Sequence, residues 1–118
     1  MVMSDCIFCK IVAKEISAKV VYEDTNLLCF RDIKPSAPVH ILLVPKKHFE
    51  WQTLSPEEAV IISQMFFVAP KIAKELGVYD SGFKLVVNCG EGAGQTLPHF
   101  HLHLLGGWVD QPKLSNLA

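Results

Sequence analysis

The sequence predicts an α+β fold with an antiparallel sheet of about five strands, one long helix and one short helix. Three observations lead to this class. Strand-like segments follow one another in hairpins, without the alternating strands and helices of a parallel sheet. One long apolar stretch with helix signals at both ends separates three strands from two. The 118 residues, half of them apolar, suffice for one domain, expected over 5–107 with a tail at 108–118.

The N-terminal half is expected to contain a short helix and three strands. The helix is predicted at residues 6–13, with Asp5 or Ser4 as its N-cap. Two strands joined by a turn form a hairpin, and a third, strongly apolar segment reads as a central strand. These three strands are expected at residues 19–24, 27–31 and 40–45.

The long helix is expected to begin after Ser55 and to end at Gly77. Ser55 is an N-cap residue, Pro56 suits the first helical position, and Glu58 completes a capping box. Pro70 lacks a backbone donor and should kink or break the helix. The helix is apolar nearly all round, either because it is deeply buried or because it faces a second subunit. The shortness of the chain favours the second subunit.

The last third is expected to form two strands around a glycine-rich loop. The strands are predicted at 83–88 and 99–105, and the loop at 89–96. Glycines allow backbone N–H groups to approach an anion closely. A loop between two strands fits neither a P-loop nor a Rossmann turn. Most such loops are plain turns, but beside the histidines described below we interpret this one as a phosphate cradle.

Composition argues against several classes of partner. The net charge of −1 gives no basic footprint for nucleic acid. The apolar stretch 60–73 is interrupted by Gln64, Pro70 and Lys71 and is a poor membrane span. The first residues do not resemble a signal peptide. We therefore expect a cytoplasmic protein with reduced cysteines and no membrane partner.

Three of the five histidines, His99, His101 and His103, recur with period two. On a strand they would share one face while the intervening apolar residues point into the core. Neighbours would lie ~7 Å apart and the outer pair ~13 Å apart, too far for one metal to bind all three on a straight strand. Three solvated histidines without a role are the plain alternative. The regular alternation instead favours three different functions.

Cys6 and Cys9 form a C-x-x-C pair. This spacing occurs in zinc sites, in redox dithiols and, by chance, in pairs of buried thiols. Zinc would need two more ligands, and His48 and His99 are candidates because each lies at a strand boundary. From the residues alone these three interpretations stay open.

For the remaining cysteines, for His40 and for the two lysines after the third strand, we expect structural rather than catalytic roles. We expect Cys29 and Cys89 to be small core residues. His40, at the start of a strand, is expected to be buried and hydrogen-bonded, while Lys46 and Lys47 belong to a solvated turn.

Together these residues closely resemble the histidine triad (HIT) family. The segment H-F-H-L-H-L-L at 99–105 fits its His-φ-His-φ-His-φ-φ signature, where φ is apolar. Five further segments are similar to the Hint branch, the nucleoside phosphoramidases: C-I-F-C-K-I at 6–11, V-Y-E-D at 21–24, F-R-D-I-K-P-S-A-P-V-H at 30–40, V-P-K-K-H at 44–48 and G-Q-T-L-P-H at 94–99. The resemblance spans most of 5–107 and implies a HIT-like fold, usually as a homodimer whose two sheets join.

The resemblance also implies a chemistry: hydrolysis or transfer of nucleotides at the α-phosphate. His101 inherits the role of the nucleophile, giving a nucleotidyl-histidine intermediate, and one of its ring nitrogens should be held by a backbone carbonyl. Asp32 and Ile33 resemble the positions that hold the ribose and the base. The phosphate-binding positions are matched by Asn88, Gly94, Gln95 and Thr96, with His103 beside them. The expected ligand is a purine nucleotide such as AMP or an adenylated small molecule.

Some bacterial members carry zinc at positions matched here by Cys6, Cys9, His48 and His99. A Cys₂His₂ set fills all four tetrahedral positions and leaves none for water. The resemblance therefore implies a structural zinc ion that ties the N-terminal segment to the start of the histidine strand.

The sequence departs from the Hint pattern in two places. Trp108 follows Gly106-Gly107 where an arginine is usual, and the rest of the tail bears little likeness, which leaves the leaving group open. Thr96 stands where Hint members often have serine, and Gln-Thr also occurs in the Fhit branch, so a dinucleoside polyphosphate hydrolase is one alternative. A non-catalytic zinc-containing nucleotide-binding module is the other. The presence of His101 and of the glycine loop argues against it.

Overall fold

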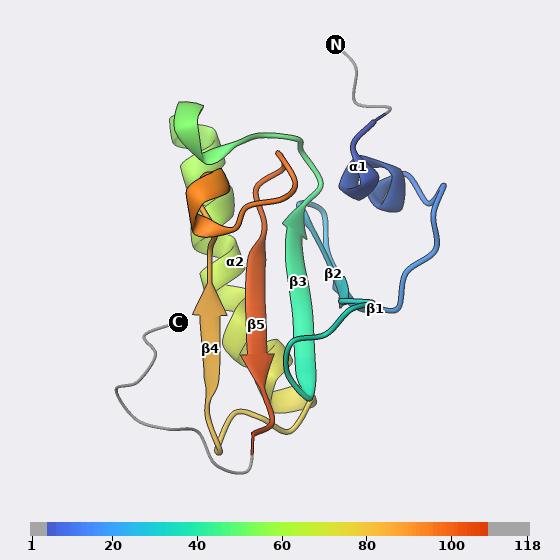
Figure 1. The fold of residues 1–118 in the computed structure, drawn as a ribbon, viewed down its shortest axis with the longest axis vertical. Coiled ribbons are helices and arrows are strands. Elements are labelled where there is room, and N and C mark those ends of the chain that lie inside the picture. Colours follow the sequence, from blue (N-terminus) through green and yellow to red (C-terminus); the bar gives the residue numbers. More distant parts are fainter. Residues whose placement is uncertain (1–4, 109–118) are drawn as a thin grey trace.

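A computed structural model describes residues 5–108, and of the expected tail at 108–118 only Trp108 lies within this range. The α+β class is confirmed, with a five-stranded antiparallel sheet of order β1-β2-β3-β5-β4 (Figure 1). The strands are β1 Val20–Glu23, β2 Leu27–Arg31, β3 Val39–Pro45, β4 Phe83–Val86 and β5 Leu102–Gly106. The helices are α1 Ile7–Val12 and α2 Pro56–Glu75, with short 3₁₀ turns η1 Trp51–Thr53 and η2 Glu91–Ala93.

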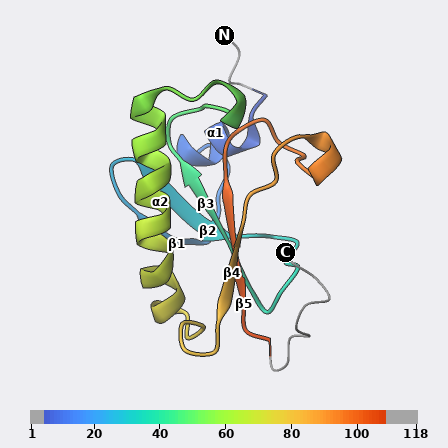
Figure 2. The same cartoon turned by 90° about the vertical axis from the view of Figure 1, so that its left-hand side faces the viewer.

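Both faces of the central strands are covered (Figure 2). Alternate side chains of β2 and β3 point in opposite directions, which is why both strands are apolar along nearly their whole length. Those facing α2 include Leu27, Cys29, Ile41 and Leu43, packed with Leu102 and Leu104 of β5. Those on the opposite face, Leu28, Phe30, Leu42 and Val44, pack with Phe8 and Ile11 of α1.

The long helix begins as predicted: the Ser55 side chain accepts from the Glu58 N–H, and the Glu58 carboxylate accepts from the Ser55 N–H. The helix nevertheless continues through Pro70 to Glu75, so a break at Pro70 is not found. The carbonyl that loses its partner at Pro70 belongs to Phe66, which is half-exposed and open to water. Among residues 5–108 no helix is long and apolar enough to cross a membrane.

The expected N-cap of α1 and the expected burial of Cys89 were both wrong. Cys6 caps α1, because its Sγ accepts the Cys9 N–H at 3.4 Å, while the alternative cap Ser4 lies outside the described residues. Cys89 is exposed and is no core residue, because it lies beyond the end of β4 where the chain has left the sheet. Cys29 is buried, as predicted.

The last strand starts later than expected, at Leu102 instead of residue 99. The Phe100 N–H donates to the Phe49 carbonyl at 2.8 Å, outside the ladder that joins β3 and β5. His99 and His101 therefore lie on the approach to the strand, and only His103 is a strand residue. Far from being solvated, His99 is fully buried and His101 is 7% exposed.

Candidate functional site

Four sulfur and imidazole groups from three parts of the chain converge beside α1. Cys6 Sγ lies 3.3 Å from His99 Nδ1, and Cys9 Sγ lies 3.2 Å from His48 Nδ1 and 3.6 Å from His99 Nδ1. All four ligand atoms lie within 4.8 Å of one another. A tetrahedral zinc ion with bonds of ~2.3 Å to sulfur and ~2.1 Å to nitrogen would separate the two ligand types by ~3.6 Å. The donor set and its spacing fit a metal of this kind.

The protonation of His99 also suits a metal ligand. Its Nε2 donates to the Pro45 carbonyl at 2.9 Å, which leaves the lone pair of Nδ1 facing the two sulfur atoms. Burial lowers the pKa of His99 from 6.5 to about 4, so that the ring is neutral at pH 7. A histidine ligand held through its second nitrogen by a carbonyl is the usual arrangement in zinc sites.

A second cluster, Asp32, His40 and His103, has the composition of a metal site. Its hydrogen bonds, however, place a proton on the nitrogen that would have to bind the metal. The Ser36 N–H donates to His40 Nδ1 at 2.9 Å, so the ring proton of neutral His40 must sit on Nε2. That Nε2 lies 2.9 Å from His103 Nδ1 and 3.5 Å from Asp32 Oδ2. A metal would have to displace this proton. The cluster is therefore a directed chain of hydrogen bonds.

The hydrogen bond between His40 and His103 determines the tautomer of His103. Because Nδ1 accepts from His40, neutral His103 carries its proton on Nε2. His40 is buried and hydrogen-bonded, as predicted, but its contact with His103 was missed. The only signal for it is register: His40 pairs with Leu105 across β3 and β5, which makes His103 its diagonal neighbour on the same face.

His101 is aimed by the backbone. Its Nδ1 donates to the His99 carbonyl at 2.7 Å, as predicted, and the lone pair of Nε2 is left for other contacts. Phe8 packs edge-on against the ring, with centroids 5.0 Å apart. Burial lowers the pKa of His101, although the Asp32 carboxylate acts in the opposite direction. The result is a neutral, oriented imidazole.

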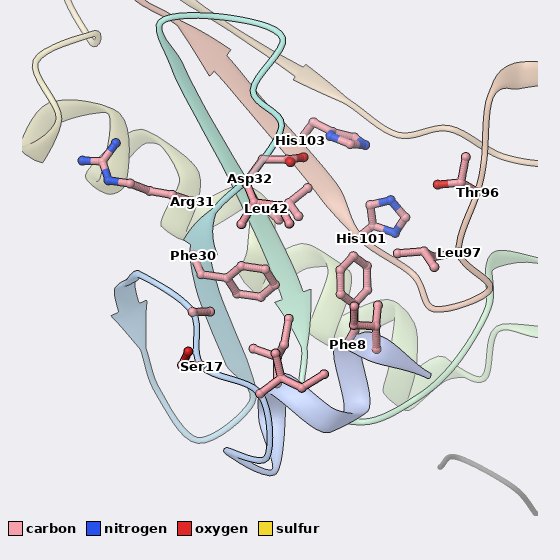
Figure 3. Close-up of a pocket in the computed structure, with 15 residues that line it drawn as sticks. Phe8, Ser17, Phe30, Arg31, Asp32, Leu42, Thr96, Leu97, His101 and His103 are labelled. Atoms are coloured by element: carbon pink, nitrogen blue, oxygen red, sulfur yellow. The ribbon is translucent and has the colours of Figure 1, made fainter. Parts of the chain in front are cut away.

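His101 and His103 line a pocket of about 300 Å³ with two chemically distinct ends (Figure 3). One end is apolar and lies between α1 and the sheet. The other end carries the Asp32 carboxylate, two imidazoles and the Thr96 hydroxyl, and Ile33, 90% exposed, lies at the rim. The apolar lining is Ile7, Phe8, Ile11, Ile16, Phe30 and Leu42, and the polar lining includes Asp32, Thr96, His101 and His103.

Of the glycine-loop residues predicted to bind phosphate, only Thr96 lines this pocket. The Asn88 amide donates to the Ala93 carbonyl at 2.7 Å. The Gln95 side chain accepts from the Gly90 N–H at 2.8 Å and donates to the Leu97 carbonyl at 3.0 Å. Gly94 has a φ of 90°, which favours glycine. Asn88, Gly94 and Gln95 thus shape the loop that presents Thr96.

Comparison with known proteins relates the sequence and the fold of this chain to one family. Residues 13–108 match the HIT domain. The protein HitA of Neisseria gonorrhoeae is 49% identical over 105 residues, covering 88% of this chain and 97% of HitA. A solved HIT family hydrolase from Legionella pneumophila Philadelphia 1 is 44% identical, with a TM-score of 0.84 over 88% of this chain and 94% of its own.

A solved Zn-bound histidine triad family protein from Mycobacterium smegmatis is 29% identical to this chain. It superimposes with a TM-score of 0.77, over 99% of this chain and 82% of its own. Sequence and structure agree in these comparisons across nearly all of the described residues. The chain belongs to the HIT family.

Proposed function

We propose that this protein is a Hint-like nucleotide hydrolase or transferase. Its substrate is a nucleoside 5′-phosphoramidate or a related nucleotidyl compound, cleaved at the α-phosphate through a nucleotidyl-His101 intermediate. The observation that carries the proposal is the orientation of His101, whose Nδ1–H is held by the His99 carbonyl at the polar end of the pocket. The similarity to a HIT family hydrolase from Legionella supports a hydrolytic reaction.

The two ends of the pocket suit the two ends of a nucleotide. The apolar end beside Phe8 and Phe30 accepts a purine ring, with Ile33 available at the rim. Asp32 lines the same pocket as the histidines, and in this proposal its carboxylate accepts hydrogen bonds from the ribose hydroxyls. The phosphate then lies among Thr96, His101 and His103 (Figure 3).

The reaction follows from the two tautomers. His101 Nε2 attacks phosphorus, a P–N bond to the histidine forms, and the bond from phosphorus to the leaving amine breaks as the amine takes up a proton from solvent, which the later hydrolysis by water returns. His103 Nε2–H donates to a non-bridging oxygen as charge moves onto it. Water then cleaves the P–N bond to His101, which releases the nucleoside monophosphate and restores the neutral imidazole.

A structural zinc ion belongs to the same proposal. Cys6, Cys9, His48 and His99 would hold it, and the Zn-bound relative from Mycobacterium smegmatis supports the assignment. With four protein ligands the ion supplies no open coordination position, and its contribution is to folding stability.

The protein acts as a homodimer in this proposal. Three large apolar side chains of α2 are exposed in the single chain: Val60 at 58%, Phe66 at 45% and Phe67 at 68%. The edge strand β4 lies at the end of the sheet, where a second β4 could extend it. Burying the α2 side chains and pairing the β4 edges would account for an apolar surface that a monomer leaves in water.

His101→Ala tests the proposed nucleophile. The variant should lose turnover of an AMP amidate and still bind AMP, because the pocket walls remain. Substantial residual turnover contradicts the assignment. Parallel assays with diadenosine tri- and tetraphosphate separate a phosphoramidase from a Fhit-like hydrolase. A wild-type protein that binds AMP but turns over none of these substrates would be the non-catalytic module.

A further inference from the structure

The segment 48–51, which follows β3, runs alongside the segment 95–100, which leads into β5 (Figure 1). The two segments touch at three successive points. These are the rings of His48 and His99 with centroids 4.7 Å apart, the Phe100 N–H and Phe49 carbonyl at 2.8 Å, and Trp51 Nε1 and Gln95 Oε1 at 3.3 Å. One end of this contact lies at the candidate metal site and the other end lies at the glycine loop.

Gln95 makes three hydrogen bonds within that loop. Its Oε1 accepts from the Gly90 N–H at 2.8 Å and its Nε2 donates to the Leu97 carbonyl at 3.0 Å, which joins the two ends of the turn. Its own backbone N–H donates to the Gly90 carbonyl at 3.1 Å. All three bonds are local, so they fix the shape of the loop without fixing where the loop lies over the pocket.

Trp51 supplies a contact from outside the loop. Its indole N–H donates to the same Gln95 oxygen. The indole also lies close to Gly90, because a Cβ built on that glycine would come within 4.0 Å of the ring. The hydrogen bond from the indole links the loop to η1, the turn that follows β3, and so opposes movement of the loop relative to the sheet.

Gln95 is followed directly by Thr96, which lines the nucleotide pocket together with His101 and His103 (Figure 3). We propose that Trp51 is a positioning residue for the phosphate end of this pocket. It acts through Gln95 to hold Thr96 and its neighbouring amides where the α-phosphate binds. The inference rests on the proposed nucleotide function and adds to it a residue that touches no part of the substrate.

The test compares AMP with adenosine, which differ only in the phosphate. Trp51→Ala should weaken AMP binding by about three- to tenfold, the range expected for one hydrogen bond, and leave adenosine binding within about twofold. Trp51→Phe keeps the ring over Gly90 but loses the N–H, and should fall between Trp51→Ala and wild type. Trp108→Phe, which replaces the other tryptophan of the chain, is the matched control.

Kinetics and fluorescence give two further readouts. With an AMP amidate the loss should appear in KM while kcat changes by less than about twofold, since the loop contacts the phosphate before and during reaction. In a Trp108→Phe background, AMP should change the emission of Trp51 and adenosine should not. Trp51→Phe combined with Gln95→Ala should bind AMP no more weakly than Gln95→Ala alone, because both act through one contact.

Three results would overturn the inference. One is AMP binding by Trp51→Ala and Trp51→Phe at the wild-type affinity. Another is an equal loss for AMP and adenosine, which would indicate general damage to the pocket. If wild-type protein does not distinguish AMP from adenosine, the proposed function itself fails and the role of Trp51 fails with it.

Discussion

At the scale of single residues, the backbone decides the chemistry of the histidines. His99 donates to the Pro45 carbonyl, His101 donates to the His99 carbonyl, and His40 accepts from the Ser36 N–H. Each of these bonds assigns the ring proton to one nitrogen. Burial then keeps the rings neutral by lowering their pKa values. In the proposed function, similar imidazoles thereby acquire different tasks: metal ligand, nucleophile and hydrogen-bond donor.

His40 should matter for activity although it does not line the pocket. His40→Gln retains an amide N–H that can reach toward His103 Nδ1, whereas His40→Leu removes the partners of both that nitrogen and the Ser36 N–H. We expect kcat for an AMP amidate to fall at least about tenfold further in the leucine variant than in the glutamine variant. Steady-state kinetics check this, with melting curves to compare folding. Equal activities of the two variants would contradict the role of His40.

The low pKa of His103 predicts how stability depends on pH. Burial, followed by repulsion from His101 and His40, lowers this pKa from 6.5 to about 4. Between pH 6.5 and pH 4 an unfolded chain binds a proton there and the folded chain does not, so folding loses stability as the pH falls. The expected loss from pH 7 to pH 5 is about 1 to 2 kcal/mol after allowing for solvent screening.

Denaturant unfolding of wild type and His103→Gln at both pH values measures this effect. The variant lacks the titrating ring, and its stability should fall less between pH 7 and pH 5. Parallel pH dependences would show that His103 is not responsible.

At the scale of the elements, the short helix α1 contributes to both the candidate metal site and the pocket. The six residues of α1 could not form a stable helix alone. Phe8 and Ile11 bury against the sheet, and Cys6 and Cys9 join the helix to His48 and His99. The same helix forms the apolar wall of the pocket. In the proposed function, the binding of a metal and the binding of a nucleotide therefore both depend on α1.

Removal of the metal should destabilise the protein. We expect one zinc ion per chain by metal analysis, and a decrease in Tm of roughly 10 °C or more after chelation. Cys9→Ser should lower Tm in the same direction and make it insensitive to the chelator. Cys89→Ser, which changes an exposed thiol away from the cluster, is the control and should behave as wild type. Purified protein without zinc would contradict the site.

At the scale of the whole molecule, α2 presents two apolar faces. One face packs on the sheet through residues such as Ile61, Met65 and Ile72. The other leaves Val60 and Phe67 more than half exposed. A short chain buries a limited fraction of its surface by itself, so an apolar outer face is most simply explained by association.

Val60→Glu should convert the proposed dimer to a monomer, because a charge buried without a partner strongly opposes association. Light scattering coupled to size exclusion gives the mass directly. Val20→Glu is the matched control, since Val20 is 43% exposed on the opposite edge strand β1 and should leave the dimer intact. A wild-type chain that elutes as a monomer would exclude the dimer.

Features set by a few neighbouring residues were predicted from the sequence, whereas features set by residues far apart in the chain were not. The Ser55 capping box and the β1–β2 hairpin are contained in a few residues and were predicted correctly. The start of β5 was misplaced because the Phe100 N–H pairs with Phe49, far away in the chain. The sequence could not decide between a kink and a break at Pro70, because the outcome depends on which side of the helix is buried.

The sequence by itself determined the α+β class, the spacing of the histidines and which cysteines and histidines were candidates for a metal site. Only the tertiary structure decided how these groups act. It distinguished the cysteine–histidine cluster from the Asp32–His40–His103 cluster through the partners that assign the ring protons of His99, His40 and His103. It also turned Gln95 away from the pocket and toward Trp51. Tautomers and orientations depend on partners brought together by folding, which spacing along a chain does not encode.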